Sequence, residues 1–525
     1  MRALKCLPSR RVVPPSRGET MLTVAVVLLV VTALLTAALA YSKYRHSYWS
    51  SRGIPTAPGL LPFVGHTHKF FTNKTPMWLF TDEVYRKVGG SGLVGLFELH
   101  NPTLLVFDPE LIKAIFIKDF DHFVDRRNFR LTGKRDEFFN EMLTQATGDH
   151  WKGIRSVISP AFTSGRMKGM FPLVGAKVDE LVTYLHQEIG SNPAIRLKRC
   201  FGLFTLEVIS SCAFGIETNS LAEGTSTFHT MAEKLTEFKI LGMLKFLLAL
   251  LFPKIFQLLK LSLLSPEVTF FKDIVTETIR HRDSGEQRRG DFLDIMLEAR
   301  QDQQESTSKI PKYPLKDLTI EAESFLFIIG GYDTTTSTLS FVTFLLAQHP
   351  TEQQRLREEV RDIIKEHGTL TYQSVMEAKI LDACISETLR LCPPAFYIER
   401  QCTKDYTLPD TSVIVPEKTI VGVPAWSLHR DPRYWSEPEI FSPDRFLPEN
   451  KGMIKAGTYL PFGLGPRNCI GMRFALMEVK LALAKIVDEF ELSCVPGREQ
   501  IEYSNHVGNM RPHEDLSLIF TPVGK

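Results

Sequence analysis

Apolar residues form one uninterrupted block near the N-terminus, from Met21 to Ala40, and this block contains no charged residue. As an α-helix, 20 such residues span about 30 Å, the thickness of a bilayer core. The pattern therefore predicts a transmembrane anchor over residues 21–41. A cleaved signal peptide is the alternative, because Ala38-Leu39-Ala40 could serve as a cleavage site, although the apolar run is long for one. The aromatic residues that follow predict an interfacial belt: Tyr41, Tyr44, Tyr48 and Trp49.

Beyond the anchor, residues 42–64 are expected to form a linker, and the prolines and glycines of RGIPTAPGLLPFVG (residues 52–65) predict that this connector is stiff and non-helical. Two strands are expected next, at Leu93–Leu99 and Thr103–Phe107, with a turn at Asn101-Pro102. Gly90 to Gly95 matches a dinucleotide fingerprint by letters, but a strand rather than a helix follows it, which argues against a nucleotide site. Asp108-Pro109 then predicts the start of a short helix.

From about residue 150 to 395 the apolar spacing is mostly helical, and after 400 strand and turn signals dominate until a last helix over Met472–Glu489. Within the helical region, Leu241 to Leu264 is unusually apolar but is interrupted by Pro253 and carries lysines. This favours a surface patch dipping into the bilayer over a second anchor. We expect a mainly α protein with small β-sheets (α+β), whose residues 65–525 form a single catalytic body.

Charge is divided unevenly along the chain, although the 525 residues sum to only +2. Residues 1–52 carry a net charge of +7, and the remainder carries −5. The acidic body makes non-specific nucleic-acid binding unlikely to be its function, so no nucleic-acid partner is expected. Residues 1–20 form an N-terminal extension, and Met21 is an alternative start. Their arginines also suit a mitochondrial transit peptide, but the apolar span that follows argues against one.

One cysteine of eight has unusual neighbours, since Cys469 lies in the run PFGLGPRNCIG, directly ahead of the last helix. The other seven are interpreted as small buried hydrophobes. Gly463 and Gly465 allow a tight turn and close approach to a flat ligand. A helix N-terminus stabilises a thiolate, and Arg467 could meet an anionic group of such a ligand.

This run resembles the cysteine-loop signature of the haem-thiolate monooxygenases, the cytochrome P-450 superfamily. The pattern F-x-x-G-x-R-x-C-x-G is met at Phe462, Gly465, Arg467, Cys469 and Gly471. The resemblance implies the P-450 fold, a haem cofactor, Cys469 as the axial iron ligand, and cofactor contacts from Phe462 and Arg467. A thiolate ligand donates electron density to iron and favours O–O cleavage.

Further motifs support the resemblance. Glu387 and Arg390 form an E-x-x-R, and Arg445 lies in FSPDRF, which is similar to the P-E-R-F segment with Asp replacing Glu. The family implies a structural Glu387–Arg390–Arg445 network. Trp151 and Arg155 match its W-x-x-x-R helix, and the resemblance assigns haem propionates to Arg155, Trp151, Arg126 and Arg400.

The expected helix from about Thr319 to Gln348 contains Gly330-Gly331-Tyr332-Asp333-Thr334-Thr335. Adjacent glycines inside a helix each cost about 1 kcal/mol relative to alanine, so close helix packing or function must favour them. The segment is similar to the family's A/G-G-x-D/E-T-T, which crosses above the haem with a locally opened turn. The resemblance implies that Asp333 and Thr334 relay protons to dioxygen. It also places five residues against the substrate: Phe129, Leu326, Ile329, Ala395 and Phe396.

The chain resembles most the microsomal group of vertebrate drug-oxidising and insect detoxifying enzymes. The implied function is insertion of one oxygen atom from dioxygen into a hydrophobic substrate, such as a xenobiotic, a steroid or a fatty acid. Electrons would come from NADPH–cytochrome P-450 reductase, since no flavin or nicotinamide site is evident. The implied location is the endoplasmic reticulum membrane, single-pass, with the catalytic domain cytosolic.

Five basic residues are expected to form the reductase-docking face behind Cys469: Lys152, Arg166, Lys168, Arg473 and Lys480. Ordinary solvated charges are the alternative interpretation. Two other functions stay open at this point. One is a haem-thiolate isomerase acting on a peroxide, which needs no external electrons. The other is a non-enzymatic haem sensor, for which a proton relay has no use.

Overall fold

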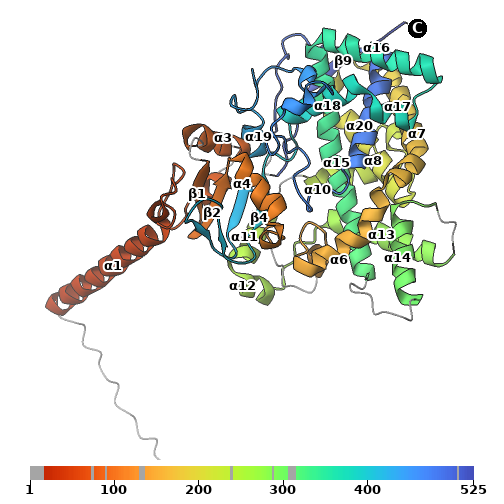
Figure 1. The fold of residues 1–525 in the computed structure, drawn as a ribbon. Helices are drawn as coiled ribbons and strands as arrows, with labels where there is room; N and C mark the ends of the chain where they lie inside the picture. Colours follow the sequence, from red (N-terminus) through yellow and green to blue (C-terminus); the bar gives the residue numbers. More distant parts are fainter. Residues whose placement is uncertain are drawn as a thin grey trace, which may run out of the picture.

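The computed structural model describes residues 17–71, 76–88, 92–128, 136–236, 240–285, 289–305, 315–504 and 508–524. A long helix, α1 (Arg17–His46), projects from a mainly helical body, and the sheet that contains β1 (Leu93–Glu98), β2 (Asn101–Val106) and β4 (Ile398–Gln401) lies on the side of the body nearest α1 (Figure 1). The mainly α architecture with small sheets confirms the expected fold class.

Short helices and two long ones make up the first half of the body. Their bounds are α2 (Thr67–Phe71), α3 (Met77–Val88), α4 (Pro109–Lys113), α5 (Glu137–Asn140), α6 (Gly148–Ile158), α7 (Ser164–Ser191), α8 (Leu197–Phe214), α9 (Ser220–Glu223), α10 (Thr227–Thr236), α11 (Ile240–Leu251) and α12 (Pro253–Leu258). The second half holds α13 (Pro266–Asp283), α14 (Phe292–Glu305), α15 (Asp317–Gln348), α16 (Pro350–His367), α17 (Tyr372–Glu377), α18 (Lys379–Leu391), α19 (Ala425–Leu428) and α20 (Met472–Glu489).

The sheets are small and join distant parts of the sequence. One has the order β1 (Leu93–Glu98), β2 (Asn101–Val106), β7 (Ile420–Val423) and β4 (Ile398–Gln401), with β2 and β7 parallel. A second has the order β3 (Ile195–Arg196), β9 (Ser517–Pro522) and β8 (Phe490–Cys494). The third pairs β5 (Tyr406–Thr407) with β6 (Ile414–Val415). The β2–β7 pairing brings Leu104 and Val421 together.

Several local predictions are confirmed. The last helix has the expected bounds, Met472–Glu489. Asp108 caps α4 by accepting hydrogen bonds from the backbone N–H groups of Glu110 (2.8 Å) and Leu111 (3.0 Å). Pro253 separates α11 from α12, because proline cannot donate the hydrogen bond that would continue the first helix.

The predicted turn at Asn101-Pro102 is wrong. These residues are the first two of β2, and the turn lies at Leu99–His100, where Leu99 has a φ of 55°. Proline is tolerated there because it is at the start of the strand.

The interfacial role expected for Trp49 is also wrong. Its side chain is completely buried, and its indole N–H donates to the Leu96 carbonyl at 3.1 Å. A Cβ at Gly95 would lie 2.2 Å from the Trp49 ring, so Gly95 makes room for the indole. Trp49 therefore anchors the chain after α1 to strand β1, whereas Tyr41 and Tyr44 are exposed.

Helix α15 runs through the centre of the body and packs against α8, α13, α18 and α20. It continues unbroken from Asp317 to Gln348, so the expected opened turn at the glycines is absent. The Thr334 hydroxyl donates to the Gly330 carbonyl at 2.7 Å, which keeps that helical carbonyl satisfied. A Cβ at Gly331 would lie 3.1 Å from Ile209 on α8, which explains a small residue there by close helix packing.

Candidate functional site

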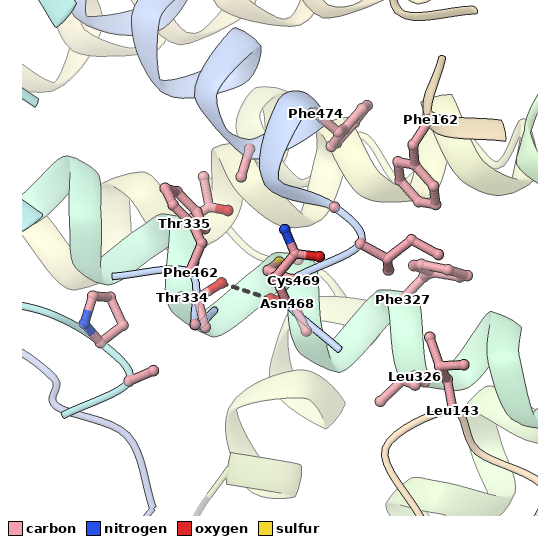
Figure 2. Close-up of a pocket in the computed structure, with 18 of the residues that line it drawn as sticks. Leu143, Phe162, Leu326, Phe327, Thr334, Thr335, Phe462, Asn468, Cys469 and Phe474 are labelled. Atoms are coloured by element: carbon pink, nitrogen blue, oxygen red, sulfur yellow. Dashed lines mark hydrogen bonds between the residues drawn. The ribbon is translucent and has the colours of Figure 1, made fainter. Parts of the chain in front are cut away.

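A largely apolar cavity of about 510 Å³ lies between α15 and the loop that leads into α20. Figure 2 shows Cys469 in this loop, beside the stretch of α15 that carries Thr334 and Thr335, with Phe162 and Phe327 further along the cavity. Other parts of its lining come from α6, α7, α8 and the segment after α18. The cavity is thus assembled from elements that are far apart in the sequence.

The cysteine loop is held by its own backbone. The Cys469 N–H donates to the Phe462 carbonyl at 2.8 Å, and the Asn468 N–H donates to Gly465 at 3.1 Å. Gly465 has a φ of 74°, and a Cβ there would lie 1.8 Å from the Phe116 carbonyl oxygen. Only glycine fits this position, since any side chain would collide with rigid backbone. The loop is therefore fixed against the body before any ligand binds.

The Cys469 side chain is open to the cavity, and it is the exposed one among the cysteines of the described residues. Burial raises the pKa of its thiol, while the N–H groups of Gly471 and Met472 and the cations Arg126 and Arg155 oppose that rise. Those same groups would stabilise a thiolate once a metal ion replaces the proton. The donor is suited to a soft or borderline metal such as haem iron.

Arginine side chains surround one end of the cavity. Arg126 donates to the Arg467 carbonyl at 3.1 Å, and Arg155 donates to the Asn468 carbonyl at 3.0 Å. Arg467 lies with its guanidinium carbon 4.9 Å from the centre of the Trp151 ring and donates to the carbonyls of Val124 and Ala146. The structure thus brings Arg126, Arg155, Arg467 and Trp151 together at the cysteine loop, and all four line the cavity.

The electrostatics of these arginines suit the binding of an anion. Burial lowers the pKa of Arg467 to about 9, with further lowering from Arg126 and Arg155 that Asp125, 3.8 Å away, opposes only in part. Burial also lowers the pKa of Arg126 and Arg155, and it lowers that of Arg400 strongly, assisted by Arg126 and Arg467. The Nε atoms of Arg400 and Arg467 have no hydrogen-bond partner in the described structure. Buried cations of like charge need a bound anion, and two carboxylates of a haem satisfy that need.

Arg400 differs from the other three, because it does not belong to the lining of the cavity. It is fully buried, its guanidinium lies over the Phe116 ring, and it donates to the Leu464 carbonyl at 3.2 Å. Arg400 therefore supports the cysteine loop through its hydrogen bond to Leu464.

Residues of the glycine-rich stretch of α15 lie on two different sides of the helix. Gly330, Gly331 and Thr334 line the cavity. Asp333 does not, since it is buried on another side of the helix and forms an ion pair with Arg511. Sequence reasoning found Asp333 but missed Arg511, because nothing local connects residues 178 positions apart.

The residues Glu387, Arg390 and Arg445 come together as a network. Glu387 and Arg390 are completely buried, with Arg390 donating to the Glu387 carboxylate at 2.7 and 2.8 Å. The Arg445 guanidinium lies 3.3 Å from the same carboxylate. Arg390 also donates to the carbonyls of His429 and Pro438, so the network ties α18 to the segment that precedes the cysteine loop.

His429, which sequence reasoning missed, extends that network to the loop. Its Nε2 accepts a hydrogen bond from the Leu460 N–H at 2.8 Å, so its Nδ1 carries the proton and donates to the Arg390 carbonyl. Burial and the nearby Arg390 lower its pKa to about 3, so it stays neutral at physiological pH. The SLHRDP sequence gave no sign of this role, which depends on Leu460 being folded against it.

The residues predicted to face the substrate divide into three groups. Leu326 and Ala395 line the cavity. Ile329 and Phe396 do not; Phe396 is buried in the core and 2% exposed, and Ile329 is partly buried against that core. Phe129 lies outside the described residues. Lining residues that were missed include Leu143, Phe162, Ile209, Phe327 and Asn509.

One of the five residues predicted to form the basic docking face is buried. Lys480 is 1 % exposed, lies 2.8 Å from an Asp382 oxygen and donates to the Met376 carbonyl, so it cannot contact a partner. The prediction for Lys480 is wrong because a charged side chain is not always on the solvent face of its helix. Lys152, Arg166, Lys168 and Arg473 are exposed.

Comparison with known proteins gives consistent matches over almost the whole chain. A family model described as cytochrome P450 matches residues 55–520. Cytochrome P450 3A11 of Mus musculus is 37% identical over 503 residues, covering 94% of this chain and 96% of the relative. Cytochrome P450 3A1 of Rattus norvegicus is 37% identical over 504 residues, covering 95% and 96% respectively. Cytochrome P450 3A12 of Canis lupus familiaris is 36% identical over 518 residues, covering 97% and 98%.

Proposed function

This chain belongs to the cytochrome P450 family of haem-thiolate monooxygenases, and from that premise we propose that it oxidises hydrophobic small molecules at the endoplasmic reticulum membrane with electrons from NADPH–cytochrome P450 reductase. The observation that carries the proposal is the Cys469 thiol, open to an apolar cavity in a loop fixed by its own backbone bonds. The boundaries 21–41 for the anchor, 42–64 for the linker and 65–525 for the catalytic domain are part of this proposal.

Each residue of the site then has a role toward the cofactor. A bound haem supplies the iron at which dioxygen is activated. Cys469 would bind the haem iron through its thiolate, and Phe462 would contact the haem. Arg126, Arg155, Trp151 and Arg467 would hold the propionates, with Arg400 in support. Glu387, Arg390 and Arg445 would keep the cysteine loop in position, a structural role.

The lining of the cavity supports an apolar substrate. Leu143, Phe162, Leu326, Phe327 and Ala395 present carbon surface, which selects by shape and hydrophobicity. Xenobiotics, steroids and fatty acids all satisfy this requirement. Titrating the haem-loaded protein with members of each class and recording the spin-state shift would identify the class that binds in the cavity.

Thr334 is proposed to hold a proton at its hydroxyl for delivery to dioxygen, with Asp333 supplying it. Replacing Thr334 by alanine is expected to lower the product formed per dioxygen consumed by about 10-fold or more, since positioned proton transfer contributes 10²–10⁴-fold. The measurement compares oxygen uptake, NADPH oxidation and product in the reconstituted system. Thr343→Ala is the control, because this buried threonine of the same helix bonds to the Leu339 carbonyl away from the cavity.

The same assay distinguishes a monooxygenase from a haem-thiolate isomerase. A peroxide-rearranging isomerase would turn over without NADPH and would be indifferent to Thr334→Ala. Turnover in the absence of NADPH and reductase would therefore contradict the monooxygenase proposal, whereas strict dependence on both supports it.

The electron donor would dock near Cys469 on the exposed cations Lys152, Arg166, Lys168 and Arg473. The body as a whole is acidic, so a local basic surface is required for an acidic partner. Lys152 lies 3.9 Å from Asp121 and 4.0 Å from Asp149, both exposed pairs that a partner could readily replace.

Two apolar surfaces support membrane binding. Helix α1 belongs to a segment, Thr20–Arg52, that is long and apolar enough to span a bilayer. On α11 and α12, Leu241 is 66% exposed, Leu244 53% and Leu258 80%. Exposed apolar side chains with neighbouring lysines are typical of a helix lying in the bilayer interface.

A protein lacking residues 1–40 is accordingly expected to keep part of its membrane affinity. Its binding to anionic vesicles, measured by sedimentation, should fall about 10-fold or more with the double change Leu244→Glu and Leu258→Glu, because burying a leucine contributes about 1.5–3 kcal/mol. Met453→Glu is the matched control, since Met453 is 76% exposed outside these helices. Equal loss from the control would mean that charge alone, and not this surface, governs binding.

A further inference from the structure

We propose that Glu323, a buried acid on α15, is a positioning residue that holds the Arg467 guanidinium in place through residues 141–146 and thereby keeps the haem firmly bound. Glu323 itself does not border the cavity, so it acts through its neighbours and not by touching the cofactor. The inference rests on the proposed function, because it takes haem as the bound group and Arg467 as a partner of its propionates.

Carbonyl groups of one short segment lie around the Arg467 guanidinium. Arg467 donates to the carbonyls of Leu143 at 3.2 Å and Ala146 at 2.7 Å. Its Nη2 also lies 3.5 Å from the Thr144 carbonyl oxygen, and a further bond goes to the Val124 carbonyl at 2.6 Å. Arg467 is only 2% exposed, so these acceptors, and not bulk water, set the position of its N–H groups. Whatever fixes residues 143–146 therefore also fixes Arg467.

Helix α15 fixes this segment at two points. The Glu323 carboxyl Oε1 accepts a hydrogen bond from the Leu143 N–H at 2.5 Å. The Thr319 hydroxyl donates to the Glu141 carboxylate at 2.7 Å. Glu323 and Thr319 are both completely buried, and their spacing of four residues places them on one face of the helix. Because Leu143 donates to Glu323 and accepts from Arg467, a single residue joins the helix to the guanidinium.

Glu323 acts as a neutral acceptor and not as a charge. Burial raises the pKa of its carboxyl well above the usual range, the nearby Glu141 raises it further, and the Leu143 N–H opposes the rise only in part. Glu141 is ionised at neutral pH, because a hydrogen bond from His150 lowers its pKa to about 2, with help from the Thr319 hydroxyl. The second oxygen of Glu323, Oε2, has no hydrogen-bond partner within the described residues. The bond from Leu143 to Oε1 is therefore the contact through which Glu323 acts.

Glu323 lies just beyond the apolar lining of the cavity. Figure 2 shows the Leu143 side chain at the same end of the cavity as Leu326, which follows Glu323 by three residues on α15. Leu143 and Leu326 line the cavity, whereas Glu323 does not. A change at Glu323 therefore leaves the residues that face the substrate in place, so that an effect on haem retention can be told apart from one on substrate binding.

Replacing Glu323 by leucine is expected to raise the rate constant of haem loss about 10-fold, the lower end of what the outer partners of a metal site contribute. Leucine is similar in size but accepts no hydrogen bond, so the Leu143 backbone and the carbonyls around Arg467 lose their tie to α15. Glu323→Gln should lose haem at close to the wild-type rate, because its amide oxygen can accept the same bond. The difference between the two variants isolates the accepting oxygen, and Glu323→Met provides a second variant without one.

The measurement is the transfer of haem from the loaded full chain to apomyoglobin, followed by absorbance, once the carbon monoxide spectrum of each variant has shown thiolate ligation. Glu478→Leu is the matched control. Glu478 is a completely buried acid on α20 whose pKa burial also raises, and its Oε1 has no partner within the described structure. Unlike Glu323, it makes no hydrogen bond to residues 141–146 in that part of the chain, so haem loss from Glu478→Leu should stay at the wild-type rate.

A double-variant cycle tests whether the effect passes through Arg467. Lysine at this position keeps the charge but cannot bond several carbonyls in one plane. Glu323→Leu should therefore speed haem loss much less in an Arg467→Lys background than in the wild type. The resonance Raman band of propionate bending gives a readout independent of turnover, and it should shift in Glu323→Leu but not in Glu323→Gln.

The possible outcomes separate this inference from the proposed function. Haem loss at the wild-type rate in both Glu323→Leu and Glu323→Met, or loss from Glu323→Gln as fast as from Glu323→Leu, would overturn the inference and leave the proposed function standing. Equal acceleration by Glu478→Leu, or by Glu323→Leu in both Arg467 backgrounds, would also overturn it, because the effect would then not depend on the tie to Arg467. A wild-type protein that lacks the thiolate spectrum would instead overturn the proposed function.

Discussion

Replacing Cys469 by serine is expected to abolish monooxygenase turnover and to remove the red-shifted Soret band that reduced protein gives with carbon monoxide. Serine keeps the size of the side chain but has no thiolate to donate electron density to iron. Even residues that only support a metal ligand contribute 10–100-fold, so loss of the ligand itself should cost more than about 100-fold. The loop should survive, because its hydrogen bonds come from the backbone of Phe462, Gly465 and Cys469.

Cys212→Ser is the sharpest control for the spectrum. Cys212 also lines the cavity, but it is buried on α8, and burial raises its thiol pKa strongly. The red-shifted band should persist in this variant. If the red-shifted band persisted in Cys469→Ser, Cys469 would not be the iron ligand, and another thiol of the cavity would have to be.

The second large effect is expected from Arg390→Leu, which should prevent accumulation of folded, haem-loaded protein. Arg390 and Glu387 are both 0% exposed, so the change leaves a carboxylate buried without its main partner. Removing one member of a buried pair costs about 3–5 kcal/mol, which is a large part of the stability of most domains. The carbonyls of His429 and Pro438 also lose their donor, and these residues precede the cysteine loop.

The measurements are the yield of haem-loaded protein and its thermal unfolding midpoint. Arg390→Lys should rescue little, because an ammonium cannot reproduce the planar fork that bonds both oxygens of Glu387. Arg361→Leu is the control. Its guanidinium is 46% exposed beside Asp488, and such surface pairs contribute about 0–1 kcal/mol. Similar losses from Arg361→Leu and Arg390→Leu would show that burial of the Glu387 network is unimportant.

Local sequence accounts for much of the architecture. The apolar spacing and the residues around it predict α20, the break at Pro253 and the cap at Asp108, because each depends on backbone geometry within a few positions. The cysteine loop is recognisable for the same reason, since its glycines, proline and thiol are contiguous. The membrane helix follows from composition and length alone.

Other assignments failed where side chains meet partners from distant segments. Trp49 was expected at the membrane surface but is buried against β1, and Lys480 was expected at a docking face but is paired with Asp382 inside the body. Amphipathic side chains suit both environments, so their type does not decide between them. Ile329 and Phe396 were expected to line the cavity, but Phe396 is buried in the core and Ile329 is partly buried against it.

By itself, the sequence predicted an apolar helix long enough to span a membrane, a mainly helical body, a candidate thiol ligand and an acid–threonine pair, because each prediction uses residues that are close together in the chain. Only the tertiary structure decided that arginines from three separate segments meet at one end of the cavity, that His429 supports the cysteine loop, and that Arg511 forms an ion pair with Asp333. The physical reason is that hydrogen bonds and charge interactions depend on distances in space, which packing sets and no local pattern records.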